Sequence, residues 1–357
     1  MGTFWQGKRV FLTGHTGFKG SWLSLWLKSL GAEVIGYSLD IPSVPSLFEI
    51  AHIGDGMKSL KGDILDSQLL QKKLSENKPD ILIHMAAQSL VRPSYQNPLE
   101  TLSTNIIGTA NVLEAARFVD SIRVIICVTS DKCYENQEWL WGYRENDPMG
   151  GIDPYSCSKG CAELVIASYR RSFFSSESAA NVASVRAGNV IGGGDWAIDR
   201  IIPDSVRAIT QGKPIPIRHP NAIRPWQHVL EPLAGYLRLA TNLWEDGANY
   251  NEGWNFGPDD NHAVPVGTLV EMLCNSWGEG AHWAVDNNTH PREANMLRLD
   301  SSKAIHRLGW RRVLTMNDTV HKTISWYKKF YNGEDPKTIT LEQIEQYQTL
   351  LKENQDA

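Results

Sequence analysis

Two short segments of this chain carry side chains that suit acid and base chemistry. Tyr155 and Lys159 stand four residues apart in a helical pattern, so they share one helix face. A nearby ammonium lowers the pKa of a tyrosine hydroxyl, and the phenolate can then take a proton from an alcohol while a cofactor takes the hydride. The segment 129–134 adds a hydroxyl, a carboxylate and an amine at the end of an apolar strand. This second set exceeds the needs of an alcohol dehydrogenase, which suggests that oxidation is only a first step.

The N-terminal segment predicts a dinucleotide site. An apolar strand at 8–13 leads into a glycine loop at 14–20, and a helical pattern follows. In this context the glycines allow a tight turn, and the helix N-terminus meets a pyrophosphate. A second strand at 33–39 ends at Asp40, where a carboxylate binds the ribose and repels a 2′-phosphate, which favours NAD. The cofactor-binding residues predicted here are Gly14, Thr16, Gly17, Phe18, Lys19, Gly20 and Asp40.

The strands and helices alternate along the first half of the chain. This alternation predicts an α/β fold with a doubly wound, Rossmann-type parallel sheet. Further strands are expected at 58–64, 80–87, 124–129 and 183–186, and a helix at 105–118. An acid that closes the third strand can contact adenine, and small residues after the fourth let the cofactor approach the backbone. These elements add Asp63, Ile64, Ala86, Ala87 and Asn105 to the cofactor-binding set, together with Tyr155 and Lys159.

The pattern breaks after the sixth strand. The loop 188–195 is rich in glycine, and prolines recur between 203 and 225. We therefore expect a smaller C-terminal, substrate-binding lobe laid over the carboxyl ends of the strands. The predicted NAD-binding domain covers 1–187, with a returning segment near 226–256. The predicted lobe covers 188–225 and 257–335. A polar tail at 336–357 is expected to form a surface helix that frays.

Composition narrows the class of protein. The net charge of −5 argues against a nucleic-acid surface. No apolar run reaches the length of a membrane span, and the N-terminus lacks a signal-type segment, so we expect no membrane partner. The five cysteines and ten histidines show no metal-ligand spacing. These features predict a cytoplasmic enzyme without a metal site.

These motifs together resemble the extended short-chain dehydrogenase/reductase family and, within it, the nucleotide-sugar 4,6-dehydratases. The resemblance covers nearly the whole chain. It implies an NAD that stays bound and is recycled in each turnover. The sugar is oxidised at C4, water is lost across C5 and C6, and hydride returns to C6. The matching segments are the loop 14–20, 63–64, 84–87, 129–134, 155–159, 186–190, 224–229 and 291–293.

The resemblance also implies catalytic roles. Ser130 and Tyr155 would bind the sugar O4, with Lys159 beside them. Asp131 would protonate the departing 6-hydroxyl, and the residue after it would remove the C5 proton, which a C4 ketone makes acidic. That residue is usually Glu; Lys132 stands here instead, as in the dehydratases that act on CDP-glucose. A lysine base must be neutral, so we expect burial or a nearby cation to lower its pKa. Two plainer interpretations stay open, namely Ser130 as a hydroxyl that caps the end of the strand and Lys132 as a solvated loop residue.

The substrate would be held mainly by residues of the lobe. Asn189, Arg224 and Arg292 are expected to bind the diphosphate, because guanidinium groups fork onto phosphate oxygens. Arg200 and His228 would shape the nucleotide pocket. Including two loop residues after the fourth strand, the predicted substrate-binding set is Gln88, Ser89, Asn189, Arg200, Arg224, His228 and Arg292.

Two other functions remain open at this point. A nucleotide-sugar epimerase needs Tyr155, Lys159 and NAD but has no use for Asp131 and Lys132. A non-catalytic NAD sensor of the same fold needs none of the four. From the resemblance we also expect a homodimer, formed by the helices that begin near 105 and 155, and a product used for the dideoxysugars of bacterial O-antigen.

Overall fold

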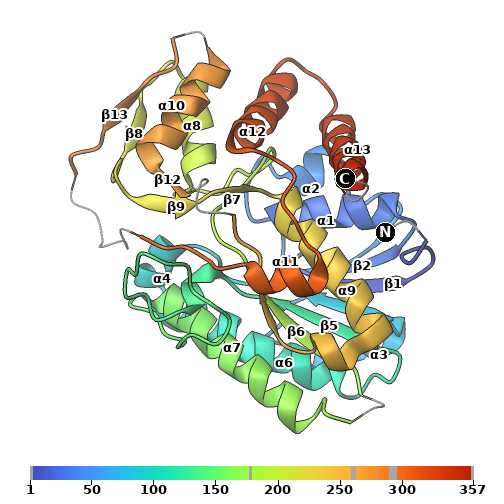
Figure 1. Ribbon diagram of the computed structural model, residues 1–357. Coiled ribbons are helices and arrows are strands. Elements are labelled where there is room, and N and C mark those ends of the chain that lie inside the picture. Colours follow the sequence, from blue (N-terminus) through green and yellow to red (C-terminus); the bar gives the residue numbers. More distant parts are fainter. Residues whose placement is uncertain (1–2, 177–178, 259–262, 279, 289–295, 355–357) are drawn as a thin grey trace.

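The computed structural model describes residues 3–176, 179–258, 263–278, 280–288 and 296–354. Seven parallel strands form one sheet in the order β11-β6-β5-β4-β1-β2-β3 (Figure 1). The order runs outward in both directions from β1, which is the doubly wound arrangement expected, so the predicted fold class is confirmed. The strands are β1 Arg9–Thr13, β2 Glu33–Ser38, β3 Lys58–Lys61, β4 Ile81–His84, β5 Val124–Val128, β6 Asn181–Arg186 and β11 Gly253–Asn255.

Helices cover both faces of this sheet. Successive strand side chains point to opposite faces, so Ile81 and Ile83 join one core while Leu82 joins the other. This is why the strands are continuous apolar runs, as buried parallel strands usually are. Helices α1 Phe18–Ser29 and α9 Leu230–Tyr250 cover the first face, and α3 Ser67–Asn77, α6 Gly108–Ala116 and α7 Pro154–Ser172 cover the second.

A smaller lobe lies beside the sheet, at the upper left of Figure 1. Its short strands pair two by two, with β8 beside β13, β9 beside β12, and β7 beside β10. Helices α8 and α10 pack on these ribbons. The elements are β7 Val190–Ile191, α8 Ile201–Thr210, β8 Ile215–Ile217, β9 Ile223–Pro225, β10 Gln227–His228, β12 Ala263–Pro265, α10 Val266–Trp277 and β13 Trp283–Val285.

The chain crosses between the two parts more than once. After β10 it returns to the sheet, where α9 packs on β5 and β6, and β11 forms the edge strand beside β6. The exact domain boundaries stay a prediction. Six short helices complete this part of the molecule: α2 Leu47–Ile50, α4 Val91–Gln96, α5 Pro98–Leu102, the π-helix η1 Ser103–Ile107, the 3-10 helix η2 Asp131–Cys133 and α11 Ser302–Leu308.

The C-terminal segment differs from the fraying surface helix that we predicted. Helix α12 Met316–Tyr331 is followed by α13 Pro336–Glu353, which packs on α12, α1 and α2. Ile344 and Tyr347 are buried, and the Tyr347 ring meets Trp26 of α1 edge to face. The prediction was wrong because the buried face of α13 includes the polar residues Thr340 and Gln343, so a polar composition does not reveal it. None of the helices in the described part of the chain is long and apolar enough to cross a bilayer.

Candidate active site

The glycine loop brings three backbone segments close together. Gly14 has a φ of 77°, and a Cβ there would lie 2.7 Å from the backbone nitrogen of Ala86. A Cβ on Gly20 would lie 2.1 Å from the Gly14 oxygen. Helix α1 begins after Gly17 with no side-chain cap and no acidic residue in its first turn. Its first backbone N–H groups therefore remain open to an anion, which fits the pyrophosphate of NAD.

The carboxylates predicted to contact NAD lie near the ends of neighbouring strands. Asp40, two residues after β2, is exposed and forms an ion pair of 2.6 Å with Lys61 at the end of β3. Exposed pairs of this kind contribute little, so the carboxylate stays available for a ribose hydroxyl. An oxygen of Asp63 accepts a hydrogen bond from the Leu65 backbone N–H at 2.9 Å. Thr16 donates to the Ser38 hydroxyl at 3.1 Å, which joins the glycine loop to β2.

Asn105 supports the cofactor loop from behind. It lies in the π-helix η1 with 1% of its surface exposed. Its amide nitrogen donates to the Gln88 carbonyl at 2.9 Å and to the Ser158 hydroxyl at 2.8 Å, and its oxygen accepts from the Gln88 N–H at 2.9 Å. Both amide protons are therefore engaged within the protein. Asn105 therefore shapes the loop that follows β4, and its contact with NAD stays a prediction.

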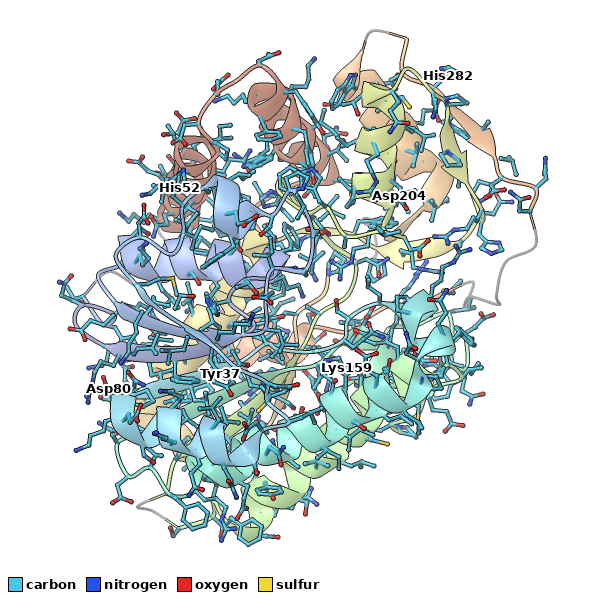
Figure 2. The ribbon with its side chains drawn as sticks, turned by 180° about the vertical axis from the view of Figure 1, so that it is seen from behind. Tyr37, His52, Asp80, Lys159, Asp204 and His282 are labelled. Atoms are coloured by element: carbon cyan, nitrogen blue, oxygen red, sulfur yellow. The ribbon has the colours of Figure 1, made fainter. Side chains whose placement is uncertain are left out.

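Helix α7 presents Tyr155 and Lys159 to the interior. Asp153 caps the helix by accepting from the Ser156 N–H, and Pro154 stands at its first position, so Tyr155 is fixed in the first turn. Tyr155 and Lys159 are 6% and 5% exposed. Figure 2 shows Lys159 in the middle of the molecule.

The pKa of Tyr155 differs from our expectation. We predicted that Lys159 lowers it; instead burial raises the pKa of Tyr155 to about 12, the Ser130 hydrogen bond lowers it, and Asp131 raises it further. Burial also lowers the pKa of Lys159 to about 8, with a smaller opposing effect of Glu163. The physical reason is that loss of water disfavours the phenolate and the ammonium alike.

Ser130 connects the two predicted catalytic sets. Its side chain lies close enough to Tyr155 to lower the pKa of that phenol, and it donates to an oxygen of Asp131 at 2.9 Å. It also accepts from the Lys132 backbone N–H at 3.2 Å and so caps η2. Ser130 therefore caps the start of η2 instead of the strand end, and its catalytic role stays a prediction. Asp131 is 1% exposed, and its second oxygen has no hydrogen-bond partner among the described residues.

Two lysines approach this carboxylate. The half-buried Lys132 is displayed by η2 next to Asp131, as the sequence requires. Lys19, which we assigned to the cofactor, has its pKa lowered to about 7 by burial, with Arg200 and Lys159 adding to the effect and Asp131 opposing it. Lowered pKa values thus occur at Lys19 and Lys159, two amines other than the predicted base Lys132. Sequence reasoning missed that Lys19 belongs to the same charge cluster.

The lobe contributes Arg200 and Arg224. Arg200 donates to Ser89 and to Asp195, each at 3.1 Å, so it bridges the loop after β4 and the lobe. Arg224 is 6% exposed. Asn189 has a φ of 43°, a conformation that few residues adopt, and its carbonyl accepts from the Gln227 N–H.

The remaining residues of the predicted substrate-binding set include Gln88, His228 and Arg292. Gln88 is tied into its own loop, because its amide nitrogen donates to the Leu90 carbonyl and the Thr101 hydroxyl. His228 is fully buried against Trp22, and burial lowers its pKa to about 3, which indicates a packing role. Arg292 lies outside the described residues.

Sequence reasoning missed a second bridge between the loop after β4 and the lobe. Asp199 forms ion pairs with Arg92 of α4 at 3.1 Å and with Arg218 of the lobe at 3.6 Å. These arginines flank Arg200 and add positive charge where a diphosphate is expected. The only available signal was the position of Arg92 four residues after Gln88, since nothing in the sequence pairs it with Asp199.

A buried polar network holds the catalytic elements in place. Glu163 stands one helical turn beyond Lys159 and forms an ion pair of 2.8 Å with Arg186 at the end of β6. It also accepts from Thr129, the residue before Ser130, and from Ser184 at 2.7 Å. Arg186 donates to the Tyr134 hydroxyl at 2.6 Å. Helix α7 and the segment 129–134 are thus anchored to the same strand.

Known proteins of similar sequence agree with this geometry. Residues 11–323 match the GDP-mannose 4,6 dehydratase family. A curated relative, the CDP-glucose 4,6-dehydratase of Salmonella typhimurium, is 53% identical over 348 residues, which cover 96% of this chain and 97% of that protein.

Similar solved structures include an NAD complex of the dTDP-glucose 4,6-dehydratase of Bacillus anthracis. Its TM-score is 0.74 at 22% identity, with 92% of this chain and 99% of that one covered. A UDP-glucuronic acid 4-epimerase from Bacillus cereus, in complex with UDP-glucuronic acid and NAD, has a TM-score of 0.77 at 21% identity over 90% of this chain and 100% of that one. At these sequence identities, similarity to a solved structure shows the fold alone. The family match and the close relative together show that the chain belongs to the GDP-mannose 4,6 dehydratase family, within the extended short-chain dehydrogenases/reductases.

Proposed function

We propose that the protein is a CDP-glucose 4,6-dehydratase, a lyase that converts CDP-D-glucose to CDP-4-keto-6-deoxy-D-glucose and water. The observation that carries this proposal is the position of Ser130, which lies close enough to Tyr155 to lower its pKa and donates a hydrogen bond to Asp131. The Ser130 hydroxyl thereby connects the residues assigned to oxidation, Tyr155 and Lys159, with those assigned to elimination, Asp131 and Lys132. The relative with 53% identity bears this activity in its name. An epimerase has no use for the second pair.

The cofactor is NAD, which when bound accepts the hydride from C4 and later returns it to C6. The glycine loop and the open N-terminus of α1 would hold its pyrophosphate, and Asp40 its ribose. Asp63 and Ile64 would flank the adenine. The small side chains of Ala86 and Ala87 would leave room for the cofactor beside the backbone after β4.

The oxidation step is assigned to α7 and Ser130. Tyr155 takes the proton from the sugar O4, and Ser130 holds the same oxygen by a hydrogen bond. Lys159 lies one turn along the helix, and its ammonium would stabilise the phenolate form of Tyr155 that accepts this proton. Burial of all three side chains excludes water from the proton being moved.

The elimination step is assigned to η2. Lys132, in its neutral form, takes the proton from C5, whose acidity comes from the new C4 ketone. Asp131, in its protonated form, gives its proton to the 6-hydroxyl, which leaves as water while a double bond forms between C5 and C6. Lys19 adds a charge that holds the Asp131 carboxylate in place between turnovers.

The nucleotide diphosphate is assigned to the arginines of the lobe. Arg200 and Arg224 would bind its oxygens, assisted by Asn189 and by Arg292, and the pair Arg92 and Arg218 adds charge nearby. Ser89, which already accepts from Arg200, would contact the sugar. Gln88 and His228 support these groups from behind.

Three further properties belong to the proposal. The protein acts in the cytoplasm, in keeping with its five free cysteines. It forms a homodimer through the surfaces of η1, α6 and α7, where Ile107, Phe118 and Leu164 are 53%, 57% and 61% exposed. Its product supplies dideoxysugars for O-antigen.

A panel of nucleotide sugars tests the proposal. The purified protein with NAD is incubated with CDP-, dTDP-, GDP- and UDP-glucose, and mass spectrometry follows loss of water. We expect turnover of CDP-glucose without added reductant, and deuterium placed at C4 of the substrate should appear at C6 of the product. A C4 epimer of unchanged mass, or deuterium released into free cofactor, would refute the dehydratase assignment.

A further inference from the structure

A cavity lined mainly by charged side chains lies away from the predicted catalytic residues. It has a volume of about 490 Å³ and opens between the C-terminal half of α7 and the helix α11, next to the edge strand β11. Helices α7 and α11 are labelled in Figure 1, with α7 along the lower edge and α11 in front of the sheet. Charged side chains dominate its lining: Glu145, Glu163, Arg170, Arg171, Arg186, Glu252, Lys303 and Arg307.

This cavity is separate from the predicted NAD and sugar sites. Arg170 follows Tyr155 by fifteen residues on the same helix. At the rise of an α-helix their Cα atoms are roughly 22 Å apart. The buried pair Glu163 and Arg186 stands between the cavity and the segment 129–134.

The carboxylates of the cavity already have partners. Glu163 is engaged by Arg186, Thr129 and Ser184, as described above. Glu252 forms ion pairs with Lys303 at 2.7 Å and with Arg307. Glu145 accepts from the Asn255 backbone N–H at 2.9 Å, and burial raises its pKa. Against three acidic side chains the cavity holds five basic ones, which leaves an excess of two positive charges.

Two consecutive arginines carry this excess. The Nη1 of Arg170 is buried and has no hydrogen-bond partner among the described residues. Burial lowers the pKa of Arg170; the charges of Arg171 and Arg186 lower it further, while Glu163 opposes them. Both arginines stand in the last turn of α7, where the helix dipole favours a cation. The dipole, however, provides no acceptor for the buried N–H.

We propose that this cavity binds a phosphate dianion on Arg170 and Arg171. Guanidinium groups pair with phosphate oxygens through two parallel N–H donors, and a charge of minus two neutralises the excess of the cavity. Its volume lies within the range of small-molecule sites, so the dianion is either inorganic phosphate or the phosphate monoester of a small metabolite.

Titration calorimetry tests this site in the whole protein. NAD and the product CDP-4-keto-6-deoxy-D-glucose, which has no phosphate monoester, are present at saturation, so that the catalytic site is filled. Ionic strength is kept constant with sodium chloride. We expect hydrogen phosphate to bind with one site per chain. Arg170→Gln should weaken this binding at least about tenfold, because one charge-assisted fork is lost. Lys213→Gln, which removes the same charge from an exposed position of the lobe, should leave it unchanged.

The two sources of the dianion are separated by a second titrant. Tighter binding of glycerol 3-phosphate than of hydrogen phosphate indicates a metabolite site, and equal or weaker binding indicates free phosphate. The proposal fails if hydrogen phosphate gives no saturable heat, or if Arg170→Gln binds it as well as the wild type does. Turnover of CDP-glucose by Arg170→Gln should be normal. If this variant does not fold, Arg171→Gln decides the question by the same comparison.

Discussion

Ser130 lies between the two sets of residues to which we assign oxidation and elimination. Its hydroxyl lowers the pKa of the Tyr155 phenol and donates to the Asp131 carboxylate. An alcohol oxidation and an elimination need different acids and bases, yet both act on adjacent carbons of one sugar. Placing a single hydroxyl between the two sets keeps both within reach of a substrate that does not move.

The first prediction concerns Tyr155. Tyr155→Phe keeps the ring and its packing but removes the group that takes the proton from O4. Turnover of CDP-glucose should fall by on the order of a hundred- to ten-thousand-fold, the usual cost of losing a general base. The matched control is Tyr169→Phe, which makes the same change further along α7. Near-normal turnover of Tyr155→Phe, measured by product formation, would disprove the assignment.

The second prediction separates elimination from oxidation at Lys132. Lys132→Met keeps the chain length but removes the amine. Substrate should still change the nicotinamide absorbance, because Tyr155 and Lys159 are intact, and the 4-keto-glucose nucleotide should accumulate. Exchange of its C5 hydrogen with deuterated water should slow sharply. If nicotinamide reduction is lost instead and C5 exchange persists, Lys132 serves oxidation or binding.

Asp131→Asn provides the contrasting variant. The amide still accepts from Ser130, but it cannot give a proton to the departing 6-hydroxyl. We expect C5 exchange to continue while loss of water slows. Equal loss of C5 exchange and of water release would show that Asp131 and Lys132 act as one unit. The separate roles of base and acid would then be wrong.

At the scale of elements, the site depends on how loops meet helix α7. The residue Gly188, which begins the loop after β6, lies directly against Asp131. A Cβ at this position would lie 1.8 Å from a carboxylate oxygen of Asp131. Only glycine leaves the carboxylate in its observed place, because the neighbouring backbone cannot retreat without moving β6.

Gly188→Ala is therefore the third prediction. The added methyl group should displace Asp131, so the rate of water loss should fall at least about tenfold, the effect of a small misplacement of a catalytic group. Affinity for NAD should change much less than this rate, because the three atoms nearest to the added methyl group all belong to Asp131. Gly54→Ala, whose Cβ would be in ordinary contact at 3.4 Å from Phe48, is the control. Full activity of Gly188→Ala would show that Asp131 tolerates displacement.

At the scale of the whole molecule, α13 connects distant parts of the chain. Glu231, in the first turn of α9, accepts from the N–H groups of Val313 and Leu314 at 3.1 and 2.8 Å, and from the Tyr347 hydroxyl at 2.8 Å. Burial raises the pKa of this carboxyl to about 7, and the hydrogen bonds partly oppose the shift. One buried acid therefore links α9, the segment before α12, and α13.

The fourth prediction is a pH dependence of stability. Below about pH 4.5 Glu231 is protonated in the folded and the unfolded chain alike. Between about 4.5 and 7 only the unfolded chain ionises, so stability falls as pH rises, by about 3 kcal/mol in total. Glu231→Gln should remove this loss, so its stability relative to the wild type should rise from pH 4.5 to pH 7 and stay level above.

Urea unfolding at several pH values measures the difference. Comparing the variant with the wild type isolates Glu231 from His84 and His228, whose lowered pKa values act in the opposite direction. A difference between the two proteins that does not vary with pH would show that Glu231 keeps an ordinary pKa in the folded chain.

The amino-acid sequence by itself determined the sheet, the glycine loop and the family. Continuous apolar strands, a Gly-rich turn and the pair Tyr155 and Lys159 are local patterns, because strand period, turn geometry and helical spacing involve residues close in the chain. The resemblance to the nucleotide-sugar 4,6-dehydratases, which is confirmed, depended on such segments. The individual roles of the site residues stay predictions.

The tertiary structure alone decided which distant groups share an environment. It paired Arg92 and Arg218 through Asp199, brought Lys19 to Asp131, buried His228, and packed α13 onto α1 and α12. It also reversed the expected shift of the Tyr155 pKa. Burial and long-range charge depend on the positions of all surrounding atoms, and residues far apart in the chain supply most of them.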